Sequence, residues 1–150
     1  DDVFLLQKAI KHKHKAHYIK SNHVTVGTST EPNFKSLVSQ RVRWASKTSN
    51  YNSLFGKLTG LIVVGMNALL LCLPLFYLAD FISLKSLIYI VFIKIMIDFL
   101  LIYKSARFLE QEQFLVSFLS SSILYPFFCT YVAIISVFSD YKWKGRQYSK

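Results

Sequence analysis

The stretch Leu58–Ala79, LTGLIVVGMNALLLCLPLFYLA, contains no charged residue. About 20 apolar residues, at 1.5 Å of rise each, are enough for a helix to cross the hydrocarbon core of a bilayer. The stretch therefore predicts a membrane-spanning helix. The composition of the whole chain agrees, because 53% of its 150 residues are hydrophobic and its mean hydropathy is +0.35. Soluble domains are usually about 45–50% apolar.

Two more apolar segments follow. Ser86–Tyr103 is interrupted by Lys94 and Asp98, whereas Phe114–Phe138 is uncharged and has Pro126 near its middle. The sequence thus predicts an all-α transmembrane region of about three helices, with a basic tail, over residues 58–150. Cys72 and Cys129 both lie within apolar runs, which favours buried thiols over a disulfide.

The charge is concentrated at the two ends of the chain. Residues 1–57 hold ten Lys or Arg and three acidic residues, residues 58–139 hold four of each, and residues 140–150 hold four basic residues and one acid. The positive-inside rule places the basic N-terminal segment in the cytoplasm. Three crossings would leave the basic tail outside, against the same rule. Either one segment does not cross or the tail breaks the bias, and the charged segment 86–103 is the best candidate for a re-entrant or interfacial element.

Lys94 and Asp98 are four residues apart, so they can pair along one helix face. Ionisable residues at membrane depth indicate a functional site by default. The favoured interpretation is nevertheless structural: the two charges neutralise each other toward the bundle, or the helix lies at the interface. A proton relay would need more titratable partners than the sequence offers.

The N-terminal third contains a basic amphipathic helix, expected over residues 3–16, and then a stretch at 16–30 with β-branched residues, a turn and one or two expected strands. A second helix is expected from Asn33 to Lys47. Its apolar residues follow the rhythm of a buried face, with Arg41 leaning toward that face, while Gln40, Arg43 and Trp44 share another face.

An amide, a guanidinium and an indole on one helix face can bind an anion and stack against a sugar ring. An interfacial Trp and a phospholipid-facing Arg before a membrane helix would give the same pattern. Periodicity alone leaves both interpretations open.

The segment Gln40–Trp44 resembles the Q-x-x-R-W motif of membrane-integrated family 2 glycosyltransferases, the cellulose synthase, hyaluronan synthase and ceramide glucosyltransferase types. Asp1-Asp2-Val3 resembles the acidic T/G-E-D motif of the family, and the tail Tyr141–Arg146 is similar to the W-[KR]-G-R ending of smaller lipid-directed members. The resemblance covers nearly the whole chain.

The resemblance implies a role for each matching residue. Asp2 takes the place of the catalytic base on the acceptor hydroxyl, and Asp1 falls where the family usually has Glu. Gln40, Arg43 and Trp44 would border the acceptor and diphosphate site, with Arg43 stabilising the leaving group. Arg41 matches a less constrained position of the motif.

The resemblance also implies an α/β fold: residues 1–57 would be the C-terminal end of a GT-A type catalytic domain, placed in the cytoplasm. The metal-binding D-x-D motif belongs upstream, so Mg²⁺ or Mn²⁺ is implied only for the full-length enzyme, and no metal ligand is assigned here. The fragment alone is expected to be inactive. The implied reaction moves a hexosyl unit, with inversion, from a nucleotide sugar to a lipid-linked or membrane-associated acceptor.

Two other classes of function stay open. One is a non-enzymatic small helical membrane protein or transporter subunit with a basic cytoplasmic arm, and the other is an anchor that binds anionic lipids. Nucleic acid is not expected as a partner, because the basic residues lie beside bilayer spans. His12, His14 and His17 do not share one helix face, which favours a solvated basic surface over a metal site.

Overall fold

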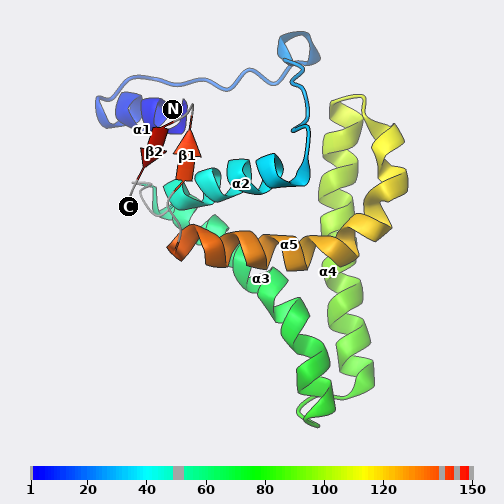
Figure 1. The fold of residues 1–150 in the computed structure, drawn as a ribbon. Coiled ribbons are helices and arrows are strands. Elements are labelled where there is room, and N and C mark those ends of the chain that lie inside the picture. Colours follow the sequence, from blue (N-terminus) through cyan, green and yellow to red (C-terminus); the bar gives the residue numbers. More distant parts are fainter. Residues whose placement is uncertain (1, 49–52, 139–140, 144–145, 149–150) are drawn as a thin grey trace. The chain divides into compact units, whose positions relative to one another are not determined.

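The computed structural model describes residues 2–48, 53–138, 141–143 and 146–148. The elements appear in Figure 1 in chain order. They are the helices α1 (Asp2–Lys11), α2 (Phe34–Thr48), α3 (Leu54–Leu78), α4 (Leu84–Phe108) and α5 (Phe118–Phe138), the short 3-10 helices η1 (Asn22–Val24) and η2 (Glu112–Ser117), and the strands β1 (Tyr141–Trp143) and β2 (Arg146–Tyr148).

The expected α/β end of a GT-A domain is wrong for this chain. Residues 16–30 form no strand, and their regular structure is the single turn η1, capped by the Ser21 hydroxyl. Val24 and Val26 are 54% and 82% exposed. β-Branched residues favour strands when they pack on a half-buried pleated surface, and these have no such surface to join. The sheet of the described residues is one antiparallel hairpin near the C-terminus, in which Tyr141 pairs with Tyr148.

The expected set of about three membrane helices is confirmed. Three helical segments are long and apolar enough to cross a membrane: Leu54–Leu78, Leu84–Phe108 and Glu112–Phe138. At 1.5 Å per residue, a helix of 25 residues such as α3 or α4 is about 37 Å long, more than the roughly 30 Å hydrocarbon core. Lys94 and Asp98 do not interrupt α4, which continues through both.

The chain forms two compact units, one of residues 1–62 and 132–150 and the other of residues 63–131. In the first unit, the Asn33 side chain caps α2 by accepting a hydrogen bond from the Ser36 backbone N–H at 2.9 Å. Helix α2 packs against β1, and the Ser46 hydroxyl donates to the carbonyl oxygen of Ser136 at 3.4 Å. A Cβ added at Gly60 in α3 would come within 3.0 Å of the Thr48 Cγ2 methyl group.

In the second unit, α3 and α4 are joined by the five-residue loop 79–83. Leu73 of α3 is 2% exposed, and the Ser83 hydroxyl caps α4 by accepting from the Ser86 N–H at 3.1 Å. The Phe99 and Phe118 rings meet edge to face with centroids 5.2 Å apart, so α4 also contacts the first residue of α5.

Three of the helices end in the same way. Lys13, Asp80 and Glu110 have positive φ angles of 61°, 58° and 55° just after α1, α3 and α4. In each case the next N–H bonds the carbonyl five residues back, as Phe81 does with Phe76 at 2.9 Å. This is the Schellman arrangement, here built without the glycine that usually occupies the left-handed position.

Candidate functional site

Helix α2 carries the residues of the Gln-x-x-Arg-Trp pattern over its second half. Gln40 is half-buried, and its Nε2 donates a 2.7 Å hydrogen bond to Oε1 of Glu31, which precedes the helix. The amide is therefore oriented by a carboxylate nine residues earlier, a contact that helical periodicity does not predict. The bond fixes one end of the side chain and presents the other, the carbonyl oxygen, as an acceptor.

Arg41 lies on the exposed side of α2, so the expectation that it leans toward the apolar face is wrong. Its guanidinium carbon is 4.6 Å from the centroid of the Trp44 ring, a cation–π contact between residues three apart. The indole is 46% exposed. Arg41 thus belongs with Trp44 in one basic and aromatic surface, and Arg43 is half-buried beside them in the sequence.

The apolar face of α2 is narrower than its periodicity predicts. Val42 is 5% exposed, whereas Phe34 is 67% exposed. Ser46, one turn after Val42, is 6% exposed and bonds to Ser136. The buried line along α2 therefore runs through Val42 and Ser46, and it is the only part of the helix that the unit encloses among the described residues.

Neither acidic residue of the expected site has a side chain among those that the structure describes. Asp1 lies outside the described residues. Asp2 is the first residue of α1, and its side chain is not among those described. The convergence of Asp2 with Gln40 and Trp44 stays a prediction.

A second polar group lies inside the 63–131 unit. Lys94 is 8% exposed, and its Nζ forms an ion pair with Asp98 Oδ2 one turn along α4. The same Nζ donates to Asn67 Oδ1 of α3 at 3.4 Å, and Asn67 Nδ2 donates to the Val63 carbonyl oxygen at 2.7 Å. The expected Lys94–Asp98 pairing is confirmed.

Asn67 is the member of this group that the sequence interpretation missed, and a signal for it existed. The middle of the α3–α4 loop is Phe81; Asn67 lies 14 residues before it and Lys94 lies 13 residues after it. In an antiparallel helix pair with a short loop, such positions come to the same level. Polar side chains bond across membrane helices in this way.

The Lys94–Asp98–Asn67 group has the properties of a structural contact between helices and not those of a catalytic site. The pair is neutral overall, Lys94 is enclosed, and Asn67 is 4% exposed. No third titratable side chain bonds to the pair among the contacts described. The geometry joins α3 to α4 and satisfies two charges that an apolar environment would otherwise penalise.

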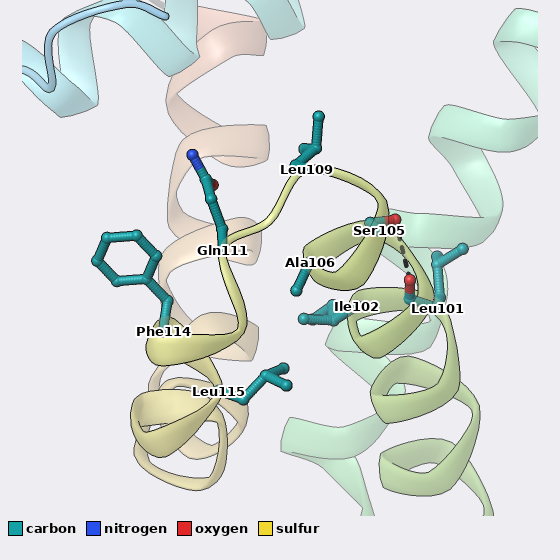
Figure 2. Close-up of a pocket in the computed structure, with 8 residues that line it drawn as sticks. All are labelled: Leu101, Ile102, Ser105, Ala106, Leu109, Gln111, Phe114 and Leu115. Atoms are coloured by element: carbon teal, nitrogen blue, oxygen red, sulfur yellow. Dashed lines mark hydrogen bonds between the residues drawn. The ribbon is translucent and has the colours of Figure 1, made fainter. Parts of the chain in front are cut away.

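Figure 2 shows a pocket of about 360 Å³ at the turn from α4 into η2. Ile102 and Ala106 of α4 point toward Leu115 of η2, and the Ser105 hydroxyl is engaged with the Leu101 carbonyl oxygen at 2.9 Å. The lining has no titratable side chain. The pocket therefore suits hydrocarbon and offers no catalytic group.

Within the described residues, no three His, Cys, Asp or Glu side chains gather as a metal site. No family model, curated protein or solved structure matches this chain.

Proposed function

We propose that this chain is the acceptor-binding and membrane-embedded part of an inverting family 2 glycosyltransferase. The full-length enzyme moves a hexosyl unit from a nucleotide sugar to a lipid-linked or membrane-associated acceptor. The observation that carries the proposal is the location of Gln40, Arg43 and Trp44 on α2, the helix that immediately precedes the first membrane-length helix. An acceptor anchored in the bilayer presents its hydroxyl group at that level.

The α2 surface has the chemistry that a sugar acceptor needs. The half-exposed Trp44 indole offers a flat apolar ring for the face of a hexose, and the Arg41 guanidinium, which lies over the ring, adds hydrogen-bond donors to this surface. The Gln40 carbonyl, oriented by the bond to Glu31, is an acceptor for a sugar hydroxyl. Recognition of this kind combines one stacked ring with a few placed polar groups.

The proposed roles in the reaction follow the resemblance. The Asp2 carboxylate takes the proton of the acceptor hydroxyl while that oxygen forms its bond to the anomeric carbon. The bond from the anomeric carbon to the nucleotide diphosphate breaks on the opposite side, which inverts the configuration. Arg43 stabilises the charge on the departing diphosphate, and Asp1 is a neighbour of the base. Donor binding and the divalent cation belong, in this proposal, to residues outside the chain.

The test uses the full-length protein in membranes, with radiolabelled nucleotide hexoses and a lipid extract as acceptor. We expect Asp2→Asn and Trp44→Ala each to abolish sugar transfer, because they remove the base and the stacking ring. Lys35→Ala, an exposed residue of the same helix, is the matched control and should retain full transfer. Resistance to carbonate extraction shows that each variant is inserted.

A small membrane protein without enzymatic activity predicts a different result. No nucleotide hexose would then be turned over by the unaltered protein, and Asp2→Asn would have no phenotype beyond stability. Either finding would overturn the proposal. Arg43→Lys tests whether phosphate binding needs the paired donors of the guanidinium or only its positive charge. We expect this variant to lose most of the transfer rate.

A further inference from the structure

We infer that the segment from α3 to α5 crosses the membrane an even number of times, so that the C-terminal hairpin returns to the face of the membrane that carries α2. Helices α3 and α4 cross as a pair, and α5 does not emerge on the far side. This inference is independent of the proposed enzymatic activity, since it depends on the packing of the chain and on the distribution of its basic and apolar residues.

The end of α5 contacts α2, the helix that precedes the membrane-length segments. Ser46, near the end of α2, donates to the carbonyl of Ser136, near the end of α5. Both serines are buried, at 6% and 7% exposed, so the contact is part of the packing of this unit. Helix α2 also packs against β1, the strand that follows α5.

The start of α3 lies beside the same end of α2. The Thr48 methyl group at the end of α2 lies against Gly60, in the second turn of α3. The start of α3 and the end of α5 therefore both lie beside the end of α2. A bilayer-spanning helix separates its ends by about 30 Å. Two ends that share one neighbour lie at the same face, and an even number of crossings must connect them.

The two crossings are those of α3 and α4. Their five-residue loop and the hydrogen bond from Lys94 to Asn67 make them an antiparallel pair. Two basic residues, Lys104 and Arg107, lie in the last two turns of α4, whereas the other end of the pair has one, Lys85, beside the loop 79–83. By the positive-inside rule, the end of α4 returns to the side of the basic N-terminal segment.

Helix α5 differs from α3 and α4 in composition and length. Its segment, Glu112–Phe138, is the least apolar of the three membrane-length segments. Helix α5 spans 21 residues, against 25 for α3 and 25 for α4, and the serine run 120–122 lies near its start. We therefore assign α5, rather than the charged α4, as the segment that enters the membrane without crossing it.

This arrangement removes the conflict between the basic tail and the positive-inside rule. The strands that carry Lys142 and Arg146 and the helix that carries Arg41 and Arg43 face the same compartment. Both basic ends of the chain then meet the same leaflet, which is the arrangement that anionic headgroups favour.

The test places single cysteines in the full-length protein with Cys72 and Cys129 changed to alanine. The four positions are Ser29→Cys before α2, Ala79→Cys in the α3–α4 loop, Gln113→Cys after α4 and Ser149→Cys in the tail. A membrane-impermeant maleimide is applied to sealed vesicles before and after permeabilisation. We expect Ser29→Cys, Gln113→Cys and Ser149→Cys to be labelled from one side and Ala79→Cys from the other.

Labelling of Ser149→Cys from the side opposite Ser29→Cys would overturn the even number of crossings. Labelling of Gln113→Cys together with Ala79→Cys would overturn the assignment of α5 and make α4 the segment that does not cross. A protease-cleavable tag after Lys150 reports the side of the C-terminus without any cysteine substitution, so a variant that fails to insert does not leave the question open.

Discussion

Helix α2 and helix α4 both place charged and polar side chains one turn apart, and they use them in opposite ways. On α2, Arg41 lies over the half-exposed ring of Trp44. On α4, Lys94 is enclosed, paired with Asp98 and bonded to Asn67 of another helix. Spacing along the helix is the same kind of signal in both cases. The two helices differ in whether another helix contributes a partner, as Asn67 does for Lys94. The local sequence does not contain that partner. Spacing alone therefore does not distinguish a surface that can bind a ligand from a polar contact that joins two helices.

The largest effect is expected from Asp98→Leu. It leaves the enclosed Lys94 ammonium without its carboxylate, and breaking one side of a buried pair typically costs about 3–5 kcal/mol. We expect about 3 kcal/mol, the low end of that range, because the Asp98 side chain remains 37% exposed. Equilibrium unfolding in mixed micelles of detergent and dodecyl sulfate measures the loss.

The double variant Lys94→Met with Asp98→Leu is the control, because it removes both charges and keeps similar volumes. Its stability should return close to that of the unaltered protein. If the double variant is as unstable as the single one, the ion pair does not stabilise this region. The proposed difference between α4 and α2 would then be wrong.

A second test compares two apolar residues of α2. Val42→Ala removes about two buried methylene equivalents at about 0.8 kcal/mol each, so we expect a loss of about 1.5 kcal/mol. Phe34→Ala removes a larger side chain that is 67% exposed and should change stability by less than about 0.5 kcal/mol. Thermal unfolding of both variants measures the two losses of stability. A larger loss for Phe34→Ala than for Val42→Ala would contradict the assignment of the buried face of α2.

Asn67→Leu tests the hydrogen bond between Lys94 and Asn67 that joins α3 and α4. It removes the cross-helix acceptor of Lys94, and bonds of this kind in membrane helices contribute about 1 kcal/mol. Met66→Leu, at the adjacent and 40% exposed position, is the matched control. A double-mutant cycle with Lys94→Met should return a coupling energy of that size, and additive effects would mean that the two side chains do not interact.

The smallest effect is expected at the surface of α2. Gln40→Ala removes the hydrogen bond to Glu31, and a partly exposed bond contributes about 0.5 kcal/mol. Hydrogen exchange of the backbone between Glu31 and the start of α2 should quicken slightly. Ser39→Ala, at an exposed neighbouring position, should leave the exchange unchanged. Equal quickening in both variants would contradict an orienting role for Glu31.

The three membrane-length helices were predictable because length and composition alone decide whether a segment can cross a bilayer. Helix α2 was predictable for a similar reason: it was expected over residues 33–47 and is observed at Phe34–Thr48, with Asn33 as its cap. The Lys94–Asp98 pair followed from spacing along one helix. Each of these features is local in sequence.

The features that were missed depend on residues far apart in the chain. Strands were expected in residues 16–30 because β-branched side chains occur there, but a strand forms only when a partner offers a ladder and a surface. Asn67 stands within an otherwise apolar run, and its importance appears only once α3 and α4 are paired. The contact of Ser46 with Ser136 joins positions 90 residues apart, beyond the reach of any periodicity.

The narrow space at Gly60 has a consequence for how closely the end of α2 packs against α3. The clearance between Thr48 and the α3 backbone is less than one methyl group, so even alanine forces its neighbour back by a few tenths of an ångström. A valine there would place further methyl groups against the Thr48 side chain, which would have to rotate or move together with the end of α2. The distance between the end of α2 and the start of α3 is therefore sensitive to the size of one side chain in the second turn of α3.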